Sequence, residues 1–133
     1  MSRPLLLDYL CVALGGAIGS VARFWLSGLA STPGNFPLGT LLVNVTGSFV
    51  IGFFGGLTGP EGRWAVAPAF RTFVMVGICG GYTTFSAFSL QTLQLLQSRQ
   101  WGHAGWNVLG SVALCLAAVW LGAFLAGSLH HRQ

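Results

Sequence analysis

The chain consists of four long apolar stretches, and only short clusters of Gly, Pro, Ser and Arg separate them. The stretches occupy residues 5–29, 36–58, 66–96 and 104–129. A helix of about 20 apolar residues crosses a hydrocarbon core of about 30 Å, so each stretch is long enough to span a membrane. The sequence therefore predicts an all-α integral membrane protein, with four transmembrane helices in a single membrane domain that covers residues 1–133.

Charged residues are too scarce for a domain that folds in water. Only 6% of the 133 residues are Asp, Glu, Lys or Arg, and 53% are hydrophobic, whereas about 25% of a typical soluble domain is charged. Disordered chains are rich in charge, so disorder is excluded as well. The net charge of +4 comes from single Arg residues spread along the chain, which form no basic stripe for nucleic acid. We expect membrane lipid, and no nucleic acid, around this protein.

No residue pattern predicts catalysis or a metal site built from side chains. The three cysteines, Cys11, Cys79 and Cys115, lie in apolar stretches without C-x-x-C spacing, as small buried hydrophobic residues do. The three histidines lie in loops or at the end of the chain, and no nucleophile has a base at a suitable spacing. We therefore expect that the protein is not an enzyme.

Glycine is abundant and regularly spaced. The chain has 20 Gly, and several form small-xxx-small pairs that let helix backbones approach closely in lipid. These pairs are Gly15 with Gly19, Gly52 with Gly56, and Gly77 with Gly81. Four short helices enclose little interior, so we also expect the chain to form oligomers.

The third stretch contains residues that disfavour a regular helix. Residues 77–88 read Gly-Ile-Cys-Gly-Gly-Tyr-Thr-Thr-Phe-Ser-Ala-Phe, and each Gly costs about 1 kcal/mol inside a helix. A broken helix at membrane depth is tolerated only where it is buried in protein or lines a polar cavity. In transporters, the backbone carbonyls of such breaks bind ions. The sequence predicts that the third helix is broken here; a packing kink without function is the alternative.

Three further features are candidates for anion contact. Phe85 and Phe88 share a helical face, and the positive edge of an aromatic ring can meet an anion; alternatively, both rings face lipid or the core. Asn44 places an amide in the membrane, which is costly unless the amide is paired, so it either donates to an anion or bonds a neighbouring helix. Asn107 and Ser111 are four residues apart and share a face.

Three motifs together resemble the CrcB/Fluc family of fluoride channels. They are the segment Gly80-Gly-Tyr-Thr-Thr-Phe-Ser-Ala-Phe88, the pattern Gly39-Thr40-x3-Asn44-x2-Gly47-Ser48, and the pattern Gly15-Gly-x2-Gly19-x3-Arg23. The resemblance covers nearly the whole chain, and the motifs occur in the family's order. It implies a fluoride-selective channel for passive fluoride efflux across the bacterial inner membrane, which gives fluoride resistance.

The resemblance also implies an assembly and site residues. The assembly is an antiparallel, dual-topology homodimer with two fluoride pores and a structural sodium ion at the dimer axis. The fluoride pore would include Asn44, Thr84, Phe85, Ser86, Phe88, Asn107 and Ser111, the carbonyls of Gly80 and Thr83 would hold sodium, and Arg23 would be the structural basic residue of the first helix. Two departures from the family pattern are Ala87, where many members carry Thr, and Asn107, where some carry Tyr.

Dual insertion requires that the two sides of the membrane carry similar positive charge. Four Arg (Arg3, Arg63, Arg71 and Arg132) are expected on the side of the termini, and two (Arg99 and Arg23) on the other. This is a slight bias toward cytoplasmic termini.

The sequence is also compatible with two other functions. A small dual-topology, proton-coupled exporter would also have four helices and would form dimers, but it needs a carboxylate in the membrane. The only carboxylates are Asp8 and Glu61, both near the ends of apolar stretches. A structural membrane assembly subunit would need no more than the glycine spacing.

Overall fold

A computed structural model describes residues 6–30, 36–60 and 62–130 of the chain. These residues contain four helical spans that are long and apolar enough to cross a membrane. They are α1 (Leu6–Leu29), α2 (Leu38–Thr58), a composite third span (Pro68–Gln97) and α6 (Trp101–His130). The predicted four-helix membrane architecture is thereby confirmed. The predicted start at Leu5 and the residues Arg3, Glu61 and Arg132 lie outside the described residues.

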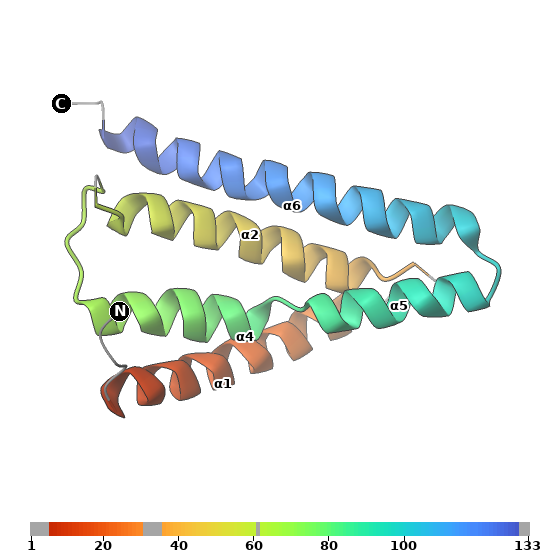
Figure 1. The fold of residues 1–133 in the computed structure, drawn as a ribbon, viewed down its shortest axis with the longest axis horizontal. Coiled ribbons are helices and arrows are strands. Elements are labelled where there is room, and N and C mark those ends of the chain that lie inside the picture. Colours follow the sequence, from red (N-terminus) through yellow and green to blue (C-terminus); the bar gives the residue numbers. More distant parts are fainter. Residues whose placement is uncertain (1–5, 31–35, 61, 131–133) are drawn as a thin grey trace.

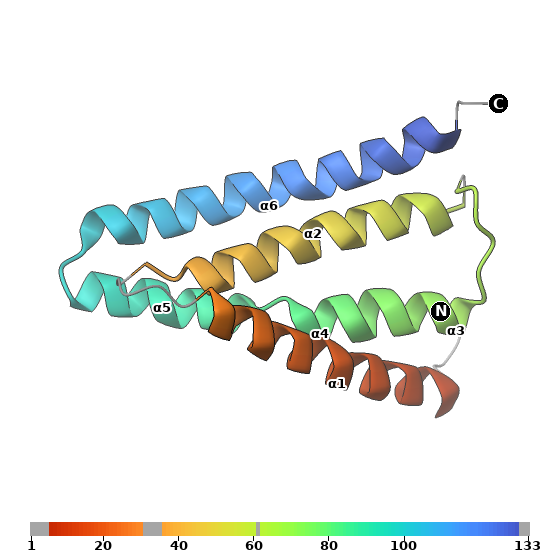
Figure 2. The same cartoon turned by 180° about the vertical axis from the view of Figure 1, so that it is seen from behind.

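The four spans run alongside one another, and the end of α1 crosses the third span to contact the start of α2 (Figure 1 and Figure 2). Figure 1 shows them in the order α6, α2, third span and α1, and Figure 2 shows the same order from behind. Helix α2 packs along α6, and α1 packs against the first half of the third span. Few apolar side chains are buried within the chain: Val43, Leu57, Cys79, Leu95, Ala104 and Ala126. Most large apolar side chains point outward, as expected for a protein whose solvent is lipid.

The third span has four parts. It begins with α3 (Pro68–Thr72), continues through the π-helical segment η1 (Phe73–Cys79) and α4 (Gly80–Tyr82), and ends with α5 (Phe85–Gln97). Between α4 and α5, Thr83 (φ −79°, ψ 156°) and Thr84 (φ −150°, ψ 114°) are extended. The span is bent there, but it stays joined end to end (Figure 1). It is not separated into two independent helices.

Two of the three predicted glycine pairs, Gly15 with Gly19 and Gly77 with Gly81, lie at contacts between α1 and the third span, whereas Gly52 and Gly56 face α6. A Cβ added at Gly81 would lie 2.6 Å from the carbonyl oxygen of Gly16, and one added at Gly77 would lie 2.9 Å from the Cα of Gly15. A Cβ added at Gly19 would overlap the carbonyl oxygen of Ile78. The two backbones are therefore in direct contact, which positions the third span against α1.

The turn between α5 and α6 contains a left-handed residue. Arg99 has φ 59°, and the N–H of the next residue, Gln100, donates to the carbonyl of Leu95 at 2.9 Å. This hydrogen bond closes the end of α5, as a left-handed residue after a helix commonly does. The short turn sets α6 beside α5, so that residues at the start of α6 face the second half of the third span.

Candidate functional site

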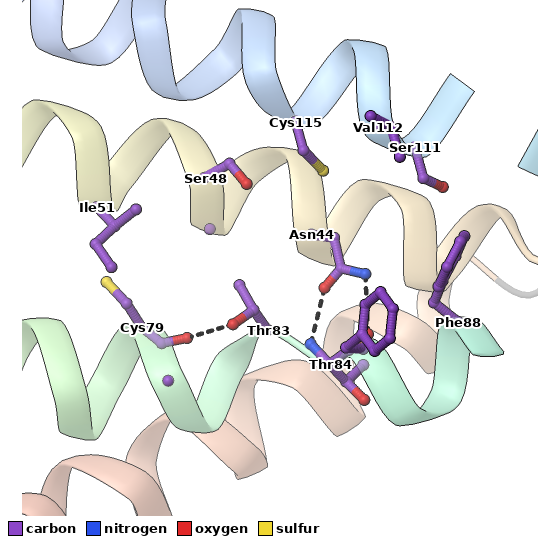
Figure 3. A pocket seen from close by; sticks show the side chains of 13 residues that line it. Asn44, Ser48, Ile51, Cys79, Thr83, Thr84, Phe88, Ser111, Val112 and Cys115 are labelled. Atoms are coloured by element: carbon purple, nitrogen blue, oxygen red, sulfur yellow. Dashed lines mark hydrogen bonds between the residues drawn. The ribbon is translucent and has the colours of Figure 1, made fainter. Parts of the chain in front are cut away.

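A cavity of about 330 Å³ lies between α2, α6 and the bend of the third span (Figure 3). Seven of the residues that the sequence analysis selected line it: Asn44, Gly80, Thr83, Thr84, Phe85, Phe88 and Ser111. The bend therefore borders a partly open cavity, and residues from three spans line it.

The amide of Asn44 is paired with the backbone of Thr84. Its Nδ2 donates to the Thr84 carbonyl at 3.0 Å, and its Oδ1 accepts from the Thr84 N–H at 2.8 Å. Figure 3 shows both bonds reaching across the cavity wall from α2 to the bend. Of the two possibilities that the sequence left open, bonding to a neighbouring helix is the one realised in the single chain. An amide NH₂ carries two hydrogens, so one hydrogen of Nδ2 is not used by this pair.

Backbone carbonyls just before the bend lose their helical donors, those of Gly80 and Thr83 among them. In an unbroken α-helix, the N–H of Thr84 would donate to Gly80, and the N–H of Ala87 would donate to Thr83. Here the Thr84 N–H donates to Asn44 Oδ1, and the Ala87 N–H donates to Thr84 Oγ1 at 3.2 Å. The carbonyls of Gly80 and Thr83 are therefore free of their usual partners. These are the two carbonyls that the resemblance assigns to sodium.

Phe85 and Phe88 form a close aromatic pair on the first turn of α5. Their ring centroids lie 5.4 Å apart, with an interplanar angle of 41°. The Phe85 side chain is 78% exposed in the single chain, whereas Phe88 is half-buried and stands beside Ser111 at the cavity (Figure 3). The ring edges of this pair can thus contact a ligand in the cavity.

Three predicted site residues do not line the cavity. Ser86 is exposed, and its hydroxyl lies 3.3 Å from Thr84 Oγ1. Asn107 is buried, and its Nδ2 donates to Thr92 Oγ1 at 2.8 Å. Arg23 is half-buried on α1 and is not among the residues around the cavity.

Two polar or polarisable residues of the cavity wall were not predicted from the sequence. Ser48 and Cys115 both line it, and Figure 3 shows them between α2 and α6. Helical spacing could have found them, because Ser48 follows Asn44 by four residues and Cys115 follows Ser111 by four.

Four apolar spans, three of which border a partly open and mostly apolar cavity with an amide, hydroxyls and an aromatic pair, define a small multi-pass membrane protein. Residues 10–123 match the family described as "CrcB-like protein, Camphor Resistance (CrcB)". The chain belongs to the CrcB family.

Curated relatives resemble this chain over nearly its whole length. It is 60% identical over 124 residues to the fluoride-specific ion channel FluC of Opitutus terrae, covering 92% of this chain and 94% of that protein. It is 53% identical over 129 residues to the protein of the same name from Methylocella silvestris, covering 96% and 98%. The match to that of Paramagnetospirillum magneticum is 58% over 119 residues, covering 88% and 93%. With four apolar spans, these similarities place the chain in the bacterial membrane as a multi-pass protein.

Proposed function

We propose that this protein is a fluoride-selective ion channel, not an enzyme, and that it lets fluoride leave the cell passively and so gives fluoride resistance. The observation that carries the proposal is the high identity, over nearly the full length, to relatives named fluoride-specific ion channels. The cavity supports it, because it combines hydrogen-bond donors with an aromatic pair, and none of the described residues that line it is charged.

Fluoride is small and strongly hydrated, so a pore has to replace its water with other donors. Asn44 and Ser111 line the cavity, so the second hydrogen of Asn44 Nδ2 and the Ser111 hydroxyl are the proposed donors, and the hydroxyls of Thr84 and Ser86 lie at the bend. The ring edges of Phe85 and Phe88 add weak positive contacts. Without a fixed cation, binding stays weak enough for the ion to leave again. Asn107 lies one turn before Ser111 on the same face of α6 and extends the polar path.

The working unit is proposed to be a homodimer. Gly80, Phe85 and Ser86 are exposed at the bend of the single chain, and the carbonyl of Gly80 has lost its helical donor. Irregular backbone at membrane depth cannot face lipid and has to be covered by protein. A second copy that packs on this face would cover it. By the family resemblance, the proposed arrangement is antiparallel, and Arg23 is the proposed structural basic residue on α1.

The same face is suited to a structural sodium ion at the dimer axis. Hard cations prefer oxygen ligands, and backbone carbonyls at interrupted helices bind Na⁺ in transporters. The diverted N–H groups of Thr84 and Ala87 leave the carbonyls of Gly80 and Thr83 in each chain without their helical donors. Among the described residues, no group of three or more His, Cys, Asp or Glu could hold a metal ion, so carbonyls are the fitting donors. A bound sodium ion would balance the partial negative charge of these carbonyls.

A fluoride-electrode assay on the purified full chain tests the proposed function. Proteoliposomes loaded with potassium fluoride should release fluoride when potassium is made permeant, and liposomes loaded with chloride should release little. Protein-free liposomes are the control for leak. Equal release of chloride and fluoride, or fluoride release no faster than from protein-free liposomes, would contradict the proposal.

A further inference from the structure

The contact between α5 and α6 contains a chain of two hydrogen bonds whose direction can be assigned. Thr92 Oγ1 donates to the carbonyl of Phe88 at 2.8 Å. A hydroxyl has a single hydrogen, so Thr92 Oγ1 can only accept from Asn107, whose Nδ2 lies at 2.8 Å. The Thr92 hydroxyl therefore fixes which way the Asn107 amide is turned.

With the amide turned in this way, the oxygen of Asn107 has no partner. The Asn107 side chain is only 1% exposed, and its Oδ1 is buried without a hydrogen bond among the described residues. A second buried acceptor in the same state is Oε1 of Gln91, the residue before Thr92. Both atoms are acceptors, so the group that satisfies them has to be a donor.

A second copy of the chain cannot supply this donor. Asn107 is only 1% exposed in the single chain and is bonded to Thr92 on α5, so a partner that docks on the surface of the chain does not reach Oδ1. The cavity is close by, because two of its lining residues are one helical turn from the pair: Phe88 precedes Thr92 by four residues, and Ser111 follows Asn107 by four. A small donor can enter from there.

We infer that a resident water molecule binds Asn107 Oδ1 at the α5–α6 contact and that Thr92 is the positioning residue that holds the amide oxygen toward it. This inference rests on the proposed function, and it means that Asn107 contacts fluoride only through the water. Fluoride is an acceptor and cannot bond an amide oxygen, whereas a water on that oxygen can turn its second hydrogen to the ion. The water converts a repelling group into a donor beside Ser111 and Phe88.

An experimental density map of the full chain in lipid, collected in chloride without fluoride, tests the inference directly. We expect a peak at about 2.5–3.0 Å from Asn107 Oδ1. A flipped amide, a protein donor on Oδ1, no peak, or a cation at about 2.4 Å would each overturn it. This measurement does not depend on transport, so it stays decisive even if the protein does not conduct fluoride.

Matched variants test the positioning role in the fluoride efflux assay. Thr92→Val keeps the shape but removes the hydroxyl, and we expect efflux to fall roughly fivefold, as for the loss of one hydrogen bond. Thr92→Ser should restore it. Ser89→Ala is the control, because Ser89 makes the same back-bond to the carbonyl of Phe85, at 2.9 Å, and is exposed. Efflux of Thr92→Val equal to wild type, with a wild-type elution profile, would overturn the positioning role.

Discussion

Asn44 on α2 takes the place of a helical neighbour for Thr84 in the third span. The two residues are 40 positions apart in the sequence, yet the amide accepts from the N–H of Thr84 at 2.8 Å and donates to its carbonyl at 3.0 Å. A residue with extended dihedrals would otherwise leave both backbone groups unpaired in the membrane, where each is costly. The shape of the third span thus depends on a side chain of a different helix.

Asn44→Ala should lower the stability of the protein and abolish most fluoride efflux. The change removes both partners of the Thr84 backbone, and each orphaned group costs about 1–3 kcal/mol. The measurement is the midpoint of thermal unfolding in detergent, followed by efflux from proteoliposomes. Val50→Ala is the control, since Val50 is a 45% exposed apolar residue on the same helix. Equal midpoints for the two variants would contradict the bridging role of Asn44.

The four spans could be predicted from the sequence, because a chain with so little charge and such long apolar stretches is compatible with few other folds. The sequence was also sufficient to place the irregularity of the third span within residues 77–88. It was not sufficient to locate the bend: Gly80 and Gly81 remain helical in α4, and the extended residues are Thr83 and Thr84. The glycine cost is small and local, whereas the pairing with Asn44 acts between distant segments and cannot be inferred from spacing.

The candidate site could also be predicted only in part, because helical spacing does not show which groups form hydrogen bonds. Residues near the bend, such as Phe85 and Phe88, and Ser111 on α6 line the cavity as a group. Asn107 has the helical spacing of a cavity residue, yet it does not line the cavity and instead bonds Thr92. Spacing shows which face a side chain shares, but not which neighbour takes its hydrogen bond.

Gly19→Ala should destabilise the contact between α1 and the third span, whereas Gly16→Ala should not. A Cβ at Gly19 would overlap the carbonyl oxygen of Ile78, which is backbone and cannot turn away, and a Cβ at Gly16 meets nothing within 4 Å. Overpacking of this kind costs about 1–3 kcal/mol. Unfolding of both variants in the same detergent measures the difference. If Gly16→Ala lowers the midpoint as much as Gly19→Ala does, the helix contact is assigned wrongly.

Phe85→Ile should reduce fluoride efflux roughly tenfold without unfolding the chain. Isoleucine keeps an apolar side chain at this position, which is 78% exposed in the single chain, but it lacks the positive ring edge. The efflux rate per protein is the measurement, and the elution profile checks the assembly. Phe24→Ile, at an 83% exposed position on α1, should conduct as wild type does. Undiminished efflux through the Phe85 variant would show that the Phe85 ring is not part of the pore.

Arg99→Gly should stabilise the turn between α5 and α6 relative to Arg99→Ala. Both changes remove the same positive charge, but only glycine adopts φ 59° without steric cost. The left-handed conformation costs other residues about 1–2 kcal/mol, so the glycine variant should have the higher unfolding midpoint. If the alanine variant is as stable as the glycine variant, then residue 99 does not adopt the left-handed conformation in the folded protein.

Removal of sodium should destabilise the proposed homodimer. A ligand that binds only the folded state stabilises it by RT ln(1 + [L]/Kd), about 2.7 kcal/mol at 100 times Kd. The unfolding midpoint should therefore rise with sodium chloride concentration but not with choline chloride at the same ionic strength. Backbone carbonyls carry the proposed site, so Thr83→Ser, which keeps both the carbonyl and the hydroxyl that donates to Cys79, should retain the sodium response. Identical midpoints in sodium and choline would contradict the assignment of the Gly80 and Thr83 carbonyls.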